Sequence, residues 1–177
     1  MIVKKNIAER EIKIPITRLK KYLNEVGITI QAMSEMSGIS RLHLQKCLDG
    51  VVDQRNGRKR TMSDDALAQL QEALHQMALD LKYIFIFYNK DREVCRRNGN
   101  CYCPDCVDQI KEQLSKYFSI SPFMQYALGW NQSKICNIMN CKDGFAYGNI
   151  SQDDCERINV VLAEISTRLD RLVLIKG

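Results

Sequence analysis

The sequence predicts an all-α protein of two tandem helix-turn-helix modules, each ending in a long helix and joined by a cysteine-rich linker. Three observations lead to this prediction. A pattern of glycines, helix caps and apolar residues occurs over residues 38–74 and again over 129–162. Apolar residues recur at helical spacing through both copies. Each copy also closes on a heptad-spaced apolar run. A repeat of this kind indicates two similar structural units.

Composition and charge limit the class of protein. The chain has 177 residues, of which 45% are hydrophobic, and this suits one globular domain or two small ones. A net charge of +5 is compatible with a polyanionic partner. The chain has no apolar run long enough for a membrane span, and its beginning lacks the apolar core of a secretory signal. We therefore expect a cytoplasmic protein with reduced thiols and no membrane contact.

The first module, residues 15–90, follows a charged arm over 1–14 that we expect to be irregular. Its caps and turn formers predict three short helices, a basic loop and a long helix. These segments run from Pro15 to Gly27, from Thr29 to Gly38, from Ser40 to about Gly50, over the loop 51–61, and from Ser63 to about Lys82.

The second module, residues 107–177, repeats this order after a linker over 91–106. Its helices are predicted from Val107 to Phe118, from a cap at Ser121 to Gly129, from a cap at Asn131 to Met139, and from a cap at Ser151 to about Asp170. The apolar tails 83–88 and 171–175 fit either a buried helix end or a short strand. We expect these tails to be paired or buried together.

Both long helices carry apolar residues at alternating spacings of three and four, which form a heptad seam. The seams consist of Leu67, Leu70, Leu74, Met77, Leu81, Ile84 and Tyr88, and of Cys155, Ile158, Leu162, Ile165, Leu169 and Leu172. Such seams offer an alternative function, in which the protein is an assembly module that forms a homodimer through its long helices without binding DNA.

In each module, a glycine followed by an apolar residue and a polar cap joins two short helices, as in GISRLHLQKC and GWNQSKICNI. A glycine in such a turn is typical of helix-turn-helix units, whose second helix enters the major groove of DNA. Polar residues at the start of that helix suit base edges. The candidates are Ser40, Arg41, His43, Gln45 and Lys46 in the first copy and Asn131, Gln132, Ser133, Lys134 and Asn137 in the second. The alternative is that these helices only pack against each other, with the polar residues serving as caps.

These two segments resemble the Cro/lambda-repressor-like helix-turn-helix family. The second copy, Asn131 to Ile135, is closer to the opening of the family's recognition helix. Ser34 and Gln125 stand where the family usually has alanine, and Ile30 and Ser121 stand where it favours glutamine. The resemblance implies a transcriptional regulator of prokaryotic or mobile-element type that binds double-stranded DNA.

Four basic residues lie in the loop beside the first predicted recognition helix: Arg55, Arg58, Lys59 and Arg60. They are positioned to neutralise DNA phosphates. A solvated basic loop is the alternative.

Four cysteines lie close together in the linker: Cys95, Cys101, Cys103 and Cys106. Four thiols close in sequence can bind zinc tetrahedrally, and a full set of four gives a structural site. The alternatives are a reduced loop without metal and a redox pair, Cys103 with Cys106. The other cysteines are expected to act mainly as small buried hydrophobes.

The chain has no phosphate-binding loop, metalloprotease motif or nucleophile elbow, so we expect no enzyme.

Overall fold

The computed structural model describes residues 11–140 and 150–176, and this part of the chain is mostly helical. Each half contributes four α-helices in the same order, three short and one of 20 residues. They are α1 (Ile16–Val26), α2 (Ile30–Ser37), α3 (Arg41–Leu48), α4 (Asp64–Tyr83), α5 (Asp105–Leu114), α6 (Ile120–Leu128), α7 (Gln132–Met139) and α8 (Gln152–Arg171). No helix in the described ranges combines the length and the apolar character that crossing a bilayer requires.

Side-chain caps explain where most of the helices begin. In five of them, the residue before the helix accepts a hydrogen bond from a backbone amide of the first turn, as the sequence predicts. These residues are Thr29, Ser40, Ser63, Asn131 and Ser151. The predicted cap at Ser121 is wrong, because α6 begins earlier with Ser119 in the capping position. The Ser121 hydroxyl instead hydrogen-bonds to the side chain of Gln132 on α7.

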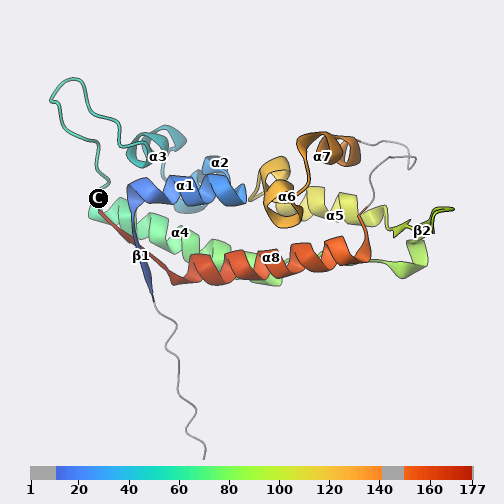
Figure 1. Cartoon of the computed structure of the whole chain (residues 1–177). Helices are drawn as coiled ribbons and strands as arrows, with labels where there is room; N and C mark the ends of the chain where they lie inside the picture. The colour runs from blue at the N-terminus through green and yellow to red at the C-terminus, as the bar shows by residue number, and fades with distance from the viewer. Residues whose placement is uncertain (1–10, 141–149, 177) are drawn as a thin grey trace, which may run out of the picture.

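The long helices α4 and α8 lie side by side and antiparallel, and the short helices cover one side of this pair (Figure 1). Their contacts fall in reverse order along the two helices, with His75 beside Asp170 and Ala78 accepting a hydrogen bond of 2.7 Å from Ser166. The central seam residues Leu70, Leu74, Met77 and Leu81 are fully buried, as are those of α8. The two predicted seams are therefore used inside one chain, where α4 packs against α8.

The turns between the first two helices of each half also meet. The Thr29 amide donates to the Tyr117 carbonyl (3.0 Å), and the Ser119 amide donates to the Gly27 carbonyl (2.8 Å). Gly27 has a φ of +84°, and a Cβ atom there would lie 2.7 Å from the backbone nitrogen of Phe123. Only glycine fits this crossing without strain. One continuous cluster of buried apolar residues includes members of both halves.

Both apolar tails leave their helices as extended chain, and each is held by a side-chain amide from the opposite long helix. Gln71 of α4 donates to the Leu172 carbonyl (2.7 Å) and accepts from the Leu174 amide (2.8 Å). Asn159 of α8 makes the equivalent pair of bonds to the backbone of Ile86 (2.8 and 2.9 Å). The two halves thus clamp each other's tails reciprocally.

Short strands complete the fold. Strand β1 (Ile12–Pro15) pairs in parallel with β4 (Leu172–Ile175), and β2 (Val94–Cys95) pairs antiparallel with β3 (Cys101–Tyr102). The expectation of an irregular arm is therefore wrong where β1 begins at Ile12, because the tail after α8 offers it a backbone partner. The rest of the arm, over 1–10, lies outside the described residues. A 3-10 turn (Lys90–Arg92) precedes β2.

Candidate functional site

The first predicted recognition helix, α3, presents a mixed surface. Arg41 and Gln45 are exposed, whereas His43 and Lys46 are half-buried. The exposed Ser40 caps the helix by accepting a hydrogen bond from the His43 amide (3.3 Å). The His43 ring nitrogen Nε2 lies 3.7 Å from the sulfur of Cys47, a buried residue on the same helix. Arg41 and Gln45 are therefore the exposed polar residues of α3, and Leu42 between them is exposed as well.

The second predicted recognition helix, α7, exposes its predicted polar residues more fully. Asn131, Gln132, Ser133, Lys134 and Asn137 are all exposed. They lie opposite the buried residues of the helix, Ile135 and Ile138.

Two of these side chains on α7 are held in place by neighbours. Gln132 accepts a hydrogen bond from Gln125 of α6 (3.2 Å), in addition to its bond from Ser121. The Lys134 ammonium group lies 3.7 Å from the centroid of the Trp130 ring, which is a cation–π contact. These contacts orient polar groups at the surface.

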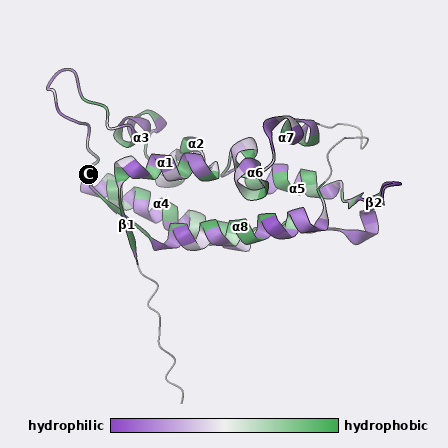
Figure 2. Ribbon diagram, in the orientation of Figure 1, coloured by the Kyte–Doolittle hydropathy of each residue, from purple (hydrophilic) through white to green (hydrophobic). Residues whose placement is uncertain are grey.

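Both helices lie on the same side of the molecule, away from the α4 and α8 pair (Figure 1). Hydrophilic and hydrophobic residues alternate along each of them, as Figure 2 shows. The structure therefore brings the two sets of predicted residues onto one side, although the sets are far apart in sequence.

The basic loop after α3 is an irregular hairpin. The Asp53 amide donates to the Arg58 carbonyl (2.8 Å), and the Arg60 amide donates to the Val51 carbonyl (2.9 Å). Arg60 also forms an ion pair with Asp53 (3.6 Å). Its three other predicted basic residues, Arg55, Arg58 and Lys59, are exposed. The hairpin extends beyond α3 in Figure 1 and carries its charges away from the core.

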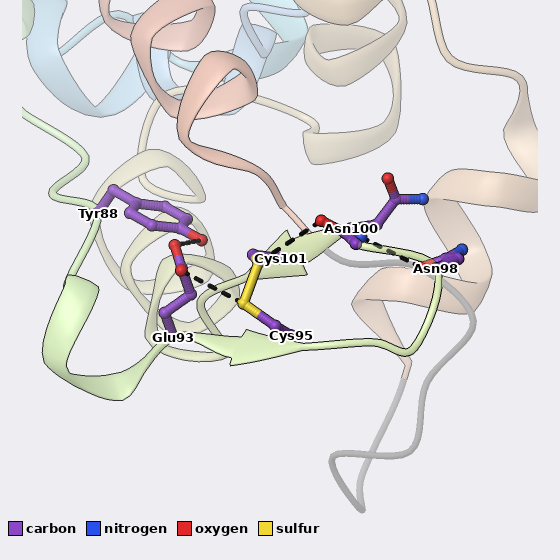
Figure 3. The surroundings of a disulfide bond; sticks show 7 residues. Tyr88, Glu93, Cys95, Asn98, Asn100 and Cys101 are labelled. Carbon is purple, nitrogen blue, oxygen red and sulfur yellow. Dashed lines mark hydrogen bonds between the residues drawn. A yellow bond between two sulfur atoms is a disulfide. The ribbon is translucent and has the colours of Figure 1, made fainter.

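The four linker cysteines do not form one cluster. Cys95 and Cys101 form a disulfide across β2 and β3, with the carboxylate of Glu93 beside it (Figure 3). Cys103 and Cys106 are instead buried. The structure therefore does not bring the four thiols of the predicted zinc site together: Cys95 and Cys101 lie on the exposed hairpin, whereas Cys103 and Cys106 lie in the core at the start of α5.

A smaller group at the hairpin could hold a metal ion. The ligand atoms of Glu93, Cys95 and Cys101 lie within 4.8 Å of one another. The Tyr88 hydroxyl donates to the Glu93 carboxylate at 2.7 Å and fixes it beside the sulfurs (Figure 3). Two of the three ligands would be thiolates only after reduction of the disulfide, so this site and the disulfide exclude each other.

Cys155 joins the two buried linker cysteines, and sequence reasoning missed this contact. Its thiol donates to the Cys106 sulfur at 3.1 Å. Cys155 was expected only as a buried position of the α8 seam. No local spacing connects it to the linker, because Cys106 and Cys155 are 49 residues apart.

Burial and hydrogen bonding shift the thiol pKa values upward. The bond with Cys155 is the main cause that raises the pKa of Cys106, and burial adds to it. Burial raises the pKa of Cys103, while the backbone amides of Asn89 and Asp105 oppose this shift by hydrogen bonding to its sulfur. Both thiols are therefore protonated at neutral pH when no metal is bound.

No protein-family model, no curated protein and no solved structure matches this chain. The resemblance to the Cro/lambda-repressor-like family consequently stays a prediction from the residues of the two turn segments.

Proposed function

We propose that this protein binds double-stranded DNA and regulates transcription, with α3 and α7 as its recognition helices. One observation carries the proposal: both helices present capped, polar N-terminal ends on the same side of the molecule (Figure 1). In this reading, α2 with α3 and α6 with α7 are two helix-turn-helix units, each turning at a left-handed glycine, Gly38 or Gly129.

The repeated architecture supports a two-half-site mode of binding. The antiparallel packing of α4 and α8 and the reciprocal tail clamps relate the two long helices by an approximate twofold axis. In the proposed mode of binding, α3 and α7 would share this relation. A helix-turn-helix dimer uses such symmetry to place two recognition helices on successive half-sites. Here one chain would supply both helices.

The two units would contribute differently. Arg41 and Gln45 on α3 suit guanine and adenine edges, and the exposed Arg55, Arg58 and Lys59 of the hairpin suit phosphates. On α7, Asn131 and Asn137 offer amides, and Gln132 is positioned by Ser121 and Gln125. The first unit would therefore supply more of the electrostatic affinity, and the second more of the hydrogen bonding.

Selection from random duplex DNA tests the proposal. Wild-type protein should enrich a defined sequence, and Arg41→Ala or Lys134→Ala should each weaken binding to it by about 1–3 kcal/mol. Lys82→Ala removes the same charge from an exposed position of α4 and is the matched control. The affinity for the enriched sequence should also fall steeply as salt rises, in proportion to the phosphates contacted. Failure to enrich any sequence, or equal losses in all three variants, would contradict the proposal.

A second candidate function is self-association, favoured by exposed apolar side chains on the outer face of the long-helix pair. Leu79 and Val160 are each 49% exposed and line a groove with Phe85, which is 62% exposed. This face is distinct from the buried seams. If it drives assembly, the protein should form a dimer whose dissociation constant changes little across the same salt series. Val160→Glu should then give a monomer in light scattering without changing the DNA result.

A further inference from the structure

Three buried cysteines converge where α5 and α8 begin. Cys103 lies two residues before the start of α5, Cys106 lies in the first turn of this helix, and Cys155 lies in the first turn of α8. The Cys103 amide donates to the Ile150 carbonyl (3.3 Å), and this bond holds the two helix starts together. Cys106 is the middle member: its sulfur hydrogen-bonds to Cys103 and lies 3.1 Å from the Cys155 sulfur.

Burial disfavours a thiolate at these positions when no metal is bound, but backbone donors and helix dipoles oppose this effect. The backbone amides of Asn89 and Asp105 hydrogen-bond to the Cys103 sulfur, as they would to a thiolate. Cys106 and Cys155 lie at the positive ends of two helix dipoles, of 10 and 20 residues. All three side chains are at most 2% exposed, so water does not compete for them. Neutral thiols would gain little from such donors.

We propose that Cys103, Cys106 and Cys155 together bind one soft, thiolate-preferring metal ion of the class of Zn²⁺ or Cu⁺. Soft ions select thiolate ligands over carboxylate or water. The ion would replace the thiol protons, which leave as the metal binds. The Cys103 and Cys155 sulfurs are more than 4.8 Å apart, since the three do not form a group within that distance. Binding of one ion by all three sulfurs would therefore require one side chain to rotate to another staggered position.

This site differs from a linker-only zinc site in one decisive way. Cys155 belongs to the second half's long helix, so the ion would join the linker to α8. The disulfide pair Cys95 and Cys101 takes no part. The inference also stands apart from DNA binding, because none of the three sulfurs lies on α3 or α7.

Metal titration of the reduced full chain under anaerobic conditions tests the site. One titration uses Co²⁺ as a coloured substitute for Zn²⁺, and a second titration uses Cu⁺. Wild-type protein should bind one equivalent of at least one ion and develop the near-ultraviolet sulfur-to-metal charge-transfer band. The double variant Cys95→Ser/Cys101→Ser should keep this band, whereas Cys155→Ser should lose it. Cys47→Ser removes a buried thiol of the first half and is the matched control.

Two results would overturn the proposal. One is the absence of the band in wild-type protein with both ions. The other is a band that survives in Cys155→Ser but disappears in Cys95→Ser/Cys101→Ser, which would assign the metal to the exposed hairpin. X-ray absorption of the metal-loaded wild type adds a readout that does not depend on variant folding. It should show three sulfur ligands, at about 2.3 Å if the ion is Zn²⁺, and fewer than three would contradict the site.

Discussion

Gly27 is the residue on which the junction of the two halves depends most directly. It combines a left-handed backbone with a close approach to Phe123. Gly129 has a similar φ of +66°, but a Cβ atom there would meet nothing within 4 Å. Comparing substitutions at Gly27 and Gly129 therefore separates the free-energy cost of the left-handed backbone from the cost of a steric clash with Phe123.

We expect Gly129→Ala to lower the free energy of unfolding by about 1–2 kcal/mol, the cost of a left-handed alanine. Gly27→Ala should cost clearly more, because its new methyl group must also displace the backbone of α6. Urea denaturation of both variants measures the difference. If both variants lose the same free energy of unfolding, the backbone of α6 moves away from the new methyl group at no measurable cost.

Residue-level prediction from sequence succeeded where the cause was local. The caps at Ser40, Ser63 and Ser151 are confirmed, because a capping side chain bonds to an amide three residues away. The partner of Cys155 was missed, since that contact depends on how two distant helix starts meet. The separation of Cys101 from Cys103 was missed for the same reason.

At the scale of elements, the side-chain amides of Gln71 and Asn159 make hydrogen bonds to an extended tail that a neighbouring β-strand would otherwise make. Each binds both a backbone donor and a backbone acceptor of an extended tail. The tail after α8 also has β1 as a partner. The tail after α4 has a second amide instead, because Gln109 bonds to the Phe87 backbone at 2.8 and 2.9 Å.

Gln71→Ala should lower the free energy of unfolding by about 1–3 kcal/mol, since it leaves the backbone groups of Leu172 and Leu174 without their side-chain partner. Native-state hydrogen exchange should show the Leu174 amide exchanging faster. The Ile86 amide, which Asn159 holds, is the internal control and should keep its rate. Equal acceleration at both amides would mean that the clamps do not act locally.

Helices were predictable as elements, whereas among the strands only β4 was expected, as one of two alternatives for the tail 171–175. Helical periodicity and caps are contained in each segment, so the bounds of α2, α3, α4 and α7 fall close to those predicted. The strand β1 depends on a partner 160 residues away, and the charged/apolar alternation over residues 11–14 is too short to predict a strand by itself. The hairpin of the basic loop likewise depends on backbone bonds that composition does not reveal.

For the whole molecule, the shared core predicts that both halves unfold together. Buried residues of the two halves form one cluster, and α4 packs along α8. The sequence repeat alone fits two independent domains equally well. The chain has one tryptophan, Trp130, which reports on the second half.

Leu74→Ala, in the first half, should lower the free energy of unfolding by about 2–5 kcal/mol, because it leaves a cavity at a fully buried position. The urea midpoint from Trp130 fluorescence should fall together with that from circular dichroism. Leu79→Ala, at an exposed position of the same helix, is the matched control. A fluorescence midpoint unchanged by Leu74→Ala would indicate independent halves.

The parallel pairing of β1 with β4 has a consequence for synthesis on the ribosome. Ile12 is synthesised 160 residues before its partner, Leu172. Closing so long a loop carries a high entropic cost, which the packed helices reduce once they hold the two segments near each other. We therefore expect the helical body to assemble before β1 pairs with β4.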